Sequence, residues 1–387
     1  MVVVEANAER SVDLEWNGDL SLDPSSADEA GPPGSDDAVR YQGSSDCRAT
    51  RSSPPGLSEA RADCPALPCG PGAISKQGDP LTNTAGLLGW EGPTRYLPPP
   101  EPRTVDDGGR RFDGVTYGVS IGYRPVLLDL WVPPSETPPP LVVWIHGGAW
   151  LFGDRRYLPE TLRPNQLFEA LLEARLAVAT IDYRHSLEAP FPAQLHDAKA
   201  AIRYLRAYGD VLGIDASRLG VWGESAGGYL AAMVGLTSER QDLEGTVGLT
   251  GPSSAVDVVV DWYGPADLGA QPRTEWTPEL AAVLPPELLI APEDHLLRGV
   301  DGVTRAAANP VAHVTASAPP FLLVHGTADR VVPFRQSALL TQALTAANVS
   351  VRLEAVNDAD HIFNGYSDID AVVRLSVDYL VHMLLHR

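Results

Sequence analysis

The chain has 387 residues, of which 44% are hydrophobic, so it can bury one large α/β domain or two modest ones. Its 29 basic and 50 acidic residues give a formal net charge of −21, which argues against nucleic acid and anionic membranes as partners. No run of about 18 apolar residues is present, so we expect no membrane span. Met1–Glu5 is too short and too acidic for a secretion signal, and we expect a cytoplasmic protein.

The three cysteines, Cys47, Cys64 and Cys69, all fall in the first fifth of the chain. Their odd count and their position argue against a disulfide framework in the rest of the chain, although a Cys64–Cys69 bridge stays open. No paired Cys-x-x-Cys and no nearby histidine accompany them, so we expect no zinc site.

Residues 1–103 differ in composition from the rest of the chain. They are rich in Ser, Asp, Gly and Pro and show no sustained period of 2 or 3.6 residues. Such a segment buries too little apolar area to offset the entropy of ordering. We expect a disordered acidic extension that ends in a proline-rich linker at 98–102, with a mis-assigned start codon as the alternative. Residues 104–387 are expected to form the folded domain.

Apolar strand-like runs alternate with helix-like runs after Thr104. Strands are expected at 126–131, 141–145, 177–181, 218–222, 256–262, 320–324 and 350–356. Helices are expected at 164–174, 193–209, 334–347 and 369–385, and another begins near 228. This alternation predicts a mostly parallel sheet covered on both faces. In such sheets ligands bind at the carboxyl ends of the strands.

The pentapeptide Gly-Glu-Ser-Ala-Gly at 223–227 lies between a predicted strand and a predicted helix. This context is typical of a nucleophile elbow, in which a tight turn presents the serine beside the free N–H groups of a helix N-terminus. Ser225 is therefore the predicted nucleophile. A second Gly-x-Ser-x-Gly match at 118–122 precedes Pro125 and a strand-like run, so Ser120 lacks the helix that an elbow requires.

A serine nucleophile needs a base, and the base needs an acid that orients it. Asp329 follows the strand predicted at 320–324, and His361 follows the strand predicted at 350–356. Both should lie at the same sheet edge as Ser225, in the chain order serine, acid, histidine. Asp329 as a simple turn residue remains the alternative. Asp358 and Asp360 are interpreted as loop residues, and His325 as structural.

The predicted strand at 141–145 runs into His-Gly-Gly-Ala-Trp at 146–150. A glycine-rich loop can turn its backbone N–H groups toward a developing oxyanion because side chains do not block them. Gly147, Gly148 and Ala149, together with Ala226 of the elbow, form the predicted oxyanion hole. The N–H groups of Gly148, Ala149 and Ala226 are expected to be the donors.

These motifs together resemble the α/β-hydrolase esterases related to hormone-sensitive lipase, and within them a branch of small bacterial feruloyl- and acetyl-esterase-like proteins. The matching segments are 146–150, 182–184 with 188–193, 223–228, 325–329 and 361–363. The resemblance extends from about residue 113 to the C-terminus. Ala149 stands where many relatives have a third glycine, and His185-Ser186 replaces the more usual Leu-Ala.

The resemblance implies an α/β-hydrolase fold with an eight-stranded, mostly parallel sheet. It also implies a Ser225–Asp329–His361 triad, no metal and no organic cofactor. Asp182, Tyr183 and Arg184 would then brace the oxyanion loop.

The expected activity is hydrolysis of small-molecule carboxylic esters, short-chain or aromatic, through an acyl-enzyme on Ser225. Residues 264–317 are expected to form a cap or substrate-binding excursion over the site. Trp150, Leu151, Trp262 and Tyr263 are candidates to line the substrate pocket, with core packing as an equal alternative. A serine amidase or peptidase is the alternative function. A non-catalytic small-ligand receptor is less favoured, because serine, acid and histidine are all present.

Overall fold

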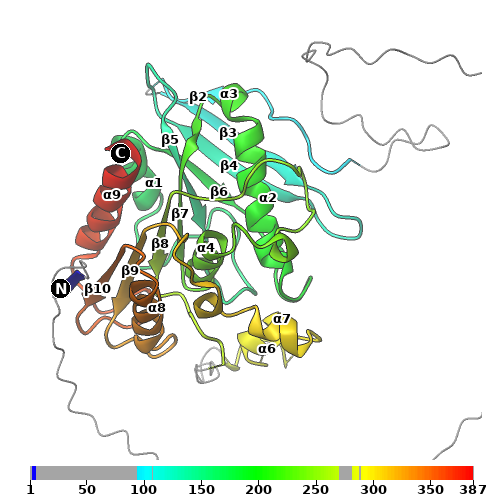
Figure 1. Ribbon diagram of the computed structural model, residues 1–387. Helices are drawn as coiled ribbons and strands as arrows, with labels where there is room; N and C mark the ends of the chain where they lie inside the picture. The colour runs from blue at the N-terminus through cyan, green and yellow to red at the C-terminus, as the bar shows by residue number, and fades with distance from the viewer. Residues whose placement is uncertain (1, 6–93, 107, 270–280, 287–288, 387) are drawn as a thin grey trace, which may run out of the picture. The chain divides into compact units, whose positions relative to one another are not determined.

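The computed structural model describes residues 2–5, 94–106, 108–269, 281–286 and 289–386. Within these residues, ten strands form one sheet with the order β1-β10-β9-β8-β7-β5-β6-β4-β3-β2 (Figure 1). The strands are β1 Val2–Glu5, β2 Arg103–Thr104, β3 Arg110–Gly118, β4 Val126–Val132, β5 Pro140–Ile145, β6 Ala177–Ile181, β7 Asp215–Glu224, β8 Val258–Trp262, β9 Phe321–Gly326 and β10 Val351–Val356. The α-helices are α1 Gln166–Glu173, α2 Ala193–Ala207, α3 Gly209–Leu212, α4 Ala226–Leu236, α6 Pro292–Leu296, α7 Gly302–Ala306, α8 Arg335–Ala346 and α9 Ile369–Leu385.

The sheet is parallel in its middle and antiparallel at its two ends. Strands β6, β5, β7, β8, β9 and β10 pair in parallel, which confirms the predicted mostly parallel sheet. Strands β4, β3 and β2 continue it antiparallel on one side, and β1 pairs antiparallel with β10 on the other. The expected count of eight strands is wrong, since the described residues alone form ten. Strand β3 escaped prediction because a register shift between Phe112 and Val115 breaks its alternation of apolar and polar residues.

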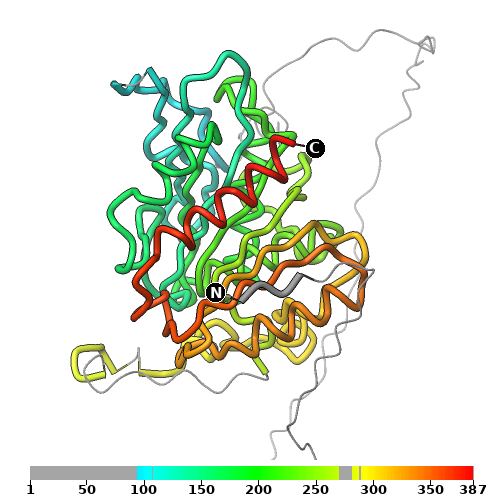
Figure 2. Tube along the Cα trace, turned by 90° about the vertical axis from the view of Figure 1, so that its left-hand side faces the viewer, coloured from blue at the N-terminus to red at the C-terminus, as the bar shows by residue number. Residues whose placement is uncertain are grey.

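Two hydrophobic clusters cover the two faces of this sheet. One contains the buried side chains of α1 and α9 with those of the sheet face beneath them. The other contains the buried side chains of α2, α4 and α8. Figure 2 shows α9, in red, running across one face of the domain. Buried apolar runs in the central strands, such as Val258–Trp262, are what a sheet covered on both faces requires.

The folded domain begins before the boundary expected at 104. The Tyr96 side chain is buried, and its ring packs edge-to-face against Tyr204 of α2. The Leu97 N–H donates to the carbonyl oxygen of Thr116 in β3. Most of the expected extension lies outside the described residues. Of its first residues, Val2–Glu5 form β1.

The segment 264–317 is described except for 270–280 and 287–288. Its helices α6 and α7, in yellow, lie together below α4 in the view of Figure 1. The carbonyl oxygen of Leu296 accepts the Phe191 N–H just before α2, and that of Ala308 accepts the hydroxyl of Tyr229 in α4. A covering role for this segment over the site stays a prediction. Within the described part of the chain, no helix is both long enough and apolar enough to cross a membrane.

Candidate active site

Strand β7 turns directly into helix α4 at Ser225, as the pentapeptide predicted. Ser225 has φ 52° and ψ −119°, a strained backbone conformation that surrounding contacts must hold. A Cβ on Gly223 would lie 2.1 Å from the carbonyl oxygen of Gly227, and a Cβ on Gly227 would lie 2.0 Å from that of Ile145. Only glycine allows this close approach of strand, turn and helix, so both glycines are needed to form the elbow.

Ser225, His361 and Asp329 form a continuous hydrogen-bonded chain. The Ser225 hydroxyl lies 3.1 Å from His361 Nε2, and His361 Nδ1 lies 2.8 Å from Asp329 Oδ2. The three residues follow β7, β10 and β9, which are parallel strands whose carboxyl ends share one sheet edge. The geometry matches a nucleophile, a base and an orienting acid.

The Asp329 carboxylate is held by more than the histidine. Its Oδ1 accepts the N–H groups of Val331 and Val332 at 2.9 and 2.8 Å. Burial would raise its pKa, but the His325 and His361 rings hold the pKa of Asp329 well below its usual range. The Asp329 carboxylate therefore stays ionised at neutral pH.

The neighbouring polar residues of the two loops are structural, as the sequence indicated. His325 is buried, with Nε2 2.8 Å from the Val332 carbonyl oxygen and Nδ1 2.7 Å from the Ser337 hydroxyl. Asp360 accepts the His361 N–H at 2.8 Å and pairs with Arg330. Neither side chain competes for the orienting position on His361 Nδ1.

The loop after β5 carries Gly148 and Ala149, whose N–H groups are two of the three expected oxyanion donors. The Gly147 N–H donates to Glu224 Oε1 at 2.6 Å, so it is already used and Gly147 is not a donor to an oxyanion. The N–H groups of Gly148, Ala149 and Ala226 have no backbone acceptor among the described residues. Gly148 and Ala149 have φ values of 96° and 55°, which give this loop its sharp turn.

Residues that follow β6 hold the loop after β5 in place through hydrogen bonds and an ion pair. The Tyr183 hydroxyl lies 3.0 and 3.1 Å from the carbonyl oxygens of His146 and Gly147. The Asp182 carboxylate accepts the Arg155 N–H at 2.9 Å and pairs with the Arg155 guanidinium at 3.2 Å. Arg184 does not brace the loop as expected, because it pairs with Asp197 of α2 at 2.8 Å.

Sequence reasoning missed several residues that support the loop. The Ser186 N–H donates to the Trp150 carbonyl oxygen at 2.8 Å, and His185 Nε2 lies 3.1 Å from the Gly153 carbonyl oxygen. Arg155 also pairs with Asp129 of β4 at 2.8 Å. The polar residues at 185 and 186, which depart from the pattern of the resembled family, were the available signal. Both of them hydrogen-bond to the loop that follows β5.

Glu224 is the most important residue near the site that the sequence analysis did not predict. It is the variable residue before the nucleophile, and its side chain is 1% exposed. Burial raises the pKa of Glu224 to about 7, while His361, the Gly147 N–H and the Tyr263 hydroxyl act in the opposite direction. An acidic residue at this position of the pentapeptide was the signal that could have indicated it.

The four residues predicted to line the substrate pocket are all buried. Trp262 has no exposed surface, packs against Trp144 and Trp222, and donates its indole N–H to Ser376 of α9 at 2.9 Å. Trp262 belongs to the hydrophobic core on the sheet face that α1 and α9 cover. Its assignment to the substrate pocket is therefore wrong. Leu151 is 5% exposed.

Trp150 and Tyr263 are buried close to the catalytic loops. Trp150 packs edge-to-face on Tyr229 of α4, with ring centres 5.2 Å apart. The Tyr263 ring lies 5.0 Å from the His361 ring and 4.8 Å from that of Phe363. Tyr263 therefore supports the histidine, and its contact with substrate stays a prediction.

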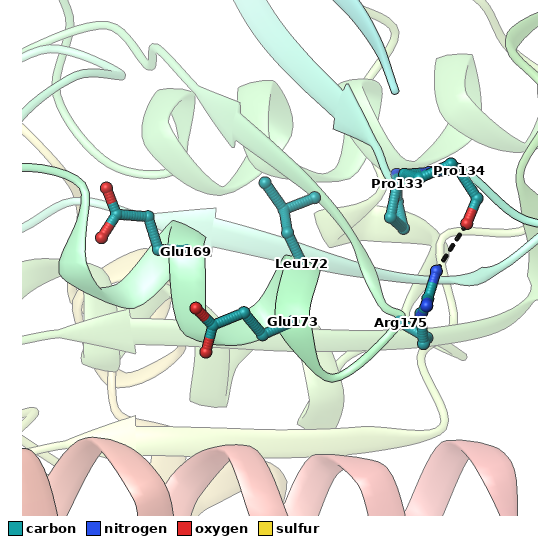
Figure 3. A pocket seen from close by; sticks show the side chains of 6 residues that line it. All are labelled: Pro133, Pro134, Glu169, Leu172, Glu173 and Arg175. Carbon is teal, nitrogen blue, oxygen red and sulfur yellow. Dashed lines mark hydrogen bonds between the residues drawn. The ribbon is translucent and has the colours of Figure 1, made fainter. Parts of the chain in front are cut away.

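A hollow of about 520 Å³ lies elsewhere on the surface (Figure 3). It is lined by Pro133, Pro134, Glu169, Leu172, Glu173 and Arg175. Because β4 is antiparallel to β6, the end of β4 meets the start of β6, at the sheet edge opposite Ser225. The hollow contains no serine, cysteine or histidine and belongs to a different part of the surface from the triad.

The described residues contain no cluster of three or more histidine, cysteine, aspartate or glutamate side chains arranged to hold a metal ion. All three cysteines lie outside the described residues.

A parallel sheet with an elbow serine after β7, an acid after β9 and a histidine after β10 defines an α/β-hydrolase fold. Residues 128–344 match the BD-FAE family. The chain belongs to this family.

Several sequence relatives are esterases of Mycobacterium tuberculosis. Esterase LipC is 32% identical over 58% of this chain and 53% of its own length. Carboxylesterase NlhH is 31% identical over 63% of this chain and 71% of its own length. The chain thus spans about half of LipC and 58% of Esterase LipQ.

Among solved structures, a truncated carbohydrate esterase from gut microbiota superposes with a TM-score of 0.59 at 27% identity. It covers 71% of this chain and 96% of its own. Propionate-bound esterase 2 of Thermogutta terrifontis superposes with a TM-score of 0.54 at 24% identity over 70% of this chain and 93% of its own, and supports the fold alone.

Proposed function

We propose that this protein is a serine carboxylesterase that hydrolyses short-chain or aromatic carboxylic esters through an acyl-enzyme on Ser225. The observation that carries the proposal is the chain of contacts from the Ser225 hydroxyl to His361 Nε2 at 3.1 Å and from His361 Nδ1 to Asp329 at 2.8 Å. A serine hydroxyl becomes a nucleophile only when such a base can take its proton.

The chemistry follows from the positions of these atoms. Ser225 Oγ attacks the ester carbonyl while His361 Nε2 takes the hydroxyl proton. The carbonyl oxygen becomes an anion that the N–H groups of Gly148, Ala149 and Ala226 would meet. His361 then gives the proton to the leaving alcohol, and the acyl group stays on Ser225. A water molecule, activated by the same histidine, releases the acid.

The names of the relatives support an ester as substrate. LipC and LipQ are named esterases and NlhH a carboxylesterase, and the first solved neighbour is a carbohydrate esterase. The net charge of −21 favours a small-molecule substrate over nucleic acid. A cytoplasmic location remains part of this proposal.

Hydrolysis of p-nitrophenyl esters from acetate to palmitate, by wild type and Ser225→Ala, tests the proposal. We expect turnover of the short esters and loss of both turnover and fluorophosphonate labelling in the variant. Retained labelling of Ser225→Ala would contradict the assignment of the nucleophile. Labelling of the wild type without turnover of any ester would favour an amidase, and a preference for long chains would favour a lipase.

A further inference from the structure

Glu224 is a buried carboxyl group that the triad mechanism does not use. It is the last residue of β7 and directly precedes Ser225. Among the described residues, no arginine or lysine forms an ion pair with it. Burial of an ionisable group without a counter-ion costs free energy, so a fold retains such a group only where its contacts compensate.

The first of these contacts is with the loop that carries the oxyanion donors. Glu224 Oε1 accepts the Gly147 N–H at 2.6 Å, a short bond of the kind that a charged acceptor forms. A Cβ on Gly147 would lie 2.0 Å from the same oxygen, so the loop backbone rests directly on the carboxyl group. Gly147 immediately precedes Gly148 and Ala149. The position of their N–H groups therefore depends on where Glu224 holds the loop.

The second interaction is electrostatic and involves His361. The charge of His361 lowers the pKa of Glu224. Glu224 directly precedes Ser225, whose hydroxyl lies 3.1 Å from His361 Nε2. The imidazolium is the form that appears when the base takes the serine proton. Asp329 supports that charge through Nδ1.

The other titratable groups that face Glu224 are tyrosines. Tyr263 after β8, Tyr183 after β6 and Tyr157 of the loop after β5 all have a pKa raised chiefly by burial, and next by the charge of Glu224. All three stay neutral at physiological pH, so none of them supplies a charge to Glu224.

We infer that Glu224 is a positioning residue of the catalytic apparatus, which holds the oxyanion loop through Gly147 and stabilises the imidazolium of His361 in the transition state. The inference rests on the proposed esterase function. It adds a second carboxylate to the site without giving that carboxylate any contact with substrate.

Glu224→Gln separates the two roles, because the amide oxygen can still accept the Gly147 N–H while the charge is lost. With p-nitrophenyl acetate we expect kcat to fall by roughly 10-fold, with KM within about twofold. The acid limb of the pH profile of kcat/KM should also change. In the wild type, Glu224, whose pKa burial raises to about 7, should contribute to that limb, and in the variant this contribution is lost.

Asp261→Asn is the matched control. Asp261 of β8 is also fully buried, and no ion pair to it is present among the described residues. Its Oδ1 accepts the Gly264 N–H at 2.8 Å, but His361 is not among the groups that act on it. This variant should keep the wild-type acid limb. Thermal melting of each variant would show whether a loss of activity comes from unfolding.

A Glu224→Gln variant that is labelled by fluorophosphonate and has the wild-type kcat and acid limb would overturn the inference alone. Absence of labelling in the wild type would instead overturn the proposed function. Where Glu224→Gln fails to fold, Glu224→Asp provides the test. It keeps the charge but shortens the reach to Gly147, so we expect a lower kcat with an unmoved acid limb, and a wild-type kcat would contradict the loop-holding role.

Discussion

The hydroxyl of Tyr183 lies 3.1 Å from the carbonyl oxygen of Gly147, and so the residue after β6 holds the loop after β5. The Gly147 N–H is held on its other side by Glu224 at 2.6 Å. Gly147 is thus held in place by residues that come from β6 and β7, the two strands on either side of β5, before any substrate binds. Preorganised donors of this kind account for much of the rate enhancement in acyl transfer.

Tyr183→Phe removes the hydroxyl and keeps the ring, which stacks on His146 at 4.4 Å. We expect kcat to fall by roughly 10-fold, because the loop loses two hydrogen bonds, with a stability loss of about 1 kcal/mol. Steady-state kinetics and thermal melting check the two effects. An unchanged kcat with a lowered melting temperature would show that the hydroxyl acts on stability alone.

Gly147→Ala places a methyl group 2.0 Å from the Glu224 carboxylate, so the loop must move. We expect a loss of about 100- to 1000-fold in kcat, which is the range seen when oxyanion donors are lost. Gly302→Ala in α7 is the control, because a Cβ there would meet nothing within 4 Å. A Gly147→Ala variant as active as this control would contradict the arrangement of the loop.

Asp329→Asn keeps the size of the acid but removes the charge that holds His361 in its productive tautomer. By analogy with other triads we expect kcat to fall by about 10⁴-fold. The oxygen of the introduced amide can still accept the N–H groups of Val331 and Val332, so the fold should persist. Far-ultraviolet circular dichroism together with kinetics would check this, and kcat within about tenfold of wild type would refute the assignment of the acid.

Asp261 makes the stability of the protein fall as pH rises. Burial raises its pKa to about 7, above the roughly 4 of an unfolded aspartate, so the folded state binds more protons between these values. Stability from this group is therefore present at pH 4 and lost as pH rises through about 7. We expect Asp261→Asn to reduce the difference in unfolding free energy between pH 5 and pH 8 by roughly 2–3 kcal/mol. Denaturant unfolding at both pH values checks this, with Asp210→Asn at an exposed position as the control. A pH dependence of Asp261→Asn equal to that of the wild type and the control would contradict the prediction.

The positions of Ser225, Asp329 and His361 could be predicted because each follows the end of a strand in a parallel sheet, and the sheet itself brings those ends together. The bond between Gly147 and Glu224 could not, since it joins the loop after β5 to the end of β7 through a side-chain rotamer that no periodicity encodes. Trp262 was misjudged for a related reason. Its place at the end of β8 was evident, but the face toward which its ring points depends on packing with α9. Strand β3 was not predicted, because its bulge interrupts the alternation of apolar and polar residues.

Ser225 and His361, the proposed nucleophile and base, are 136 residues apart in the chain and come together only where β7 and β10 both belong to the finished sheet. Strands β8 and β9 must be in register between them. A chain that has folded only as far as the elbow has the serine but no base. We therefore expect reactivity at Ser225 only in the completed domain. A molecule in which β10 has detached would be inactive while most of its structure is intact.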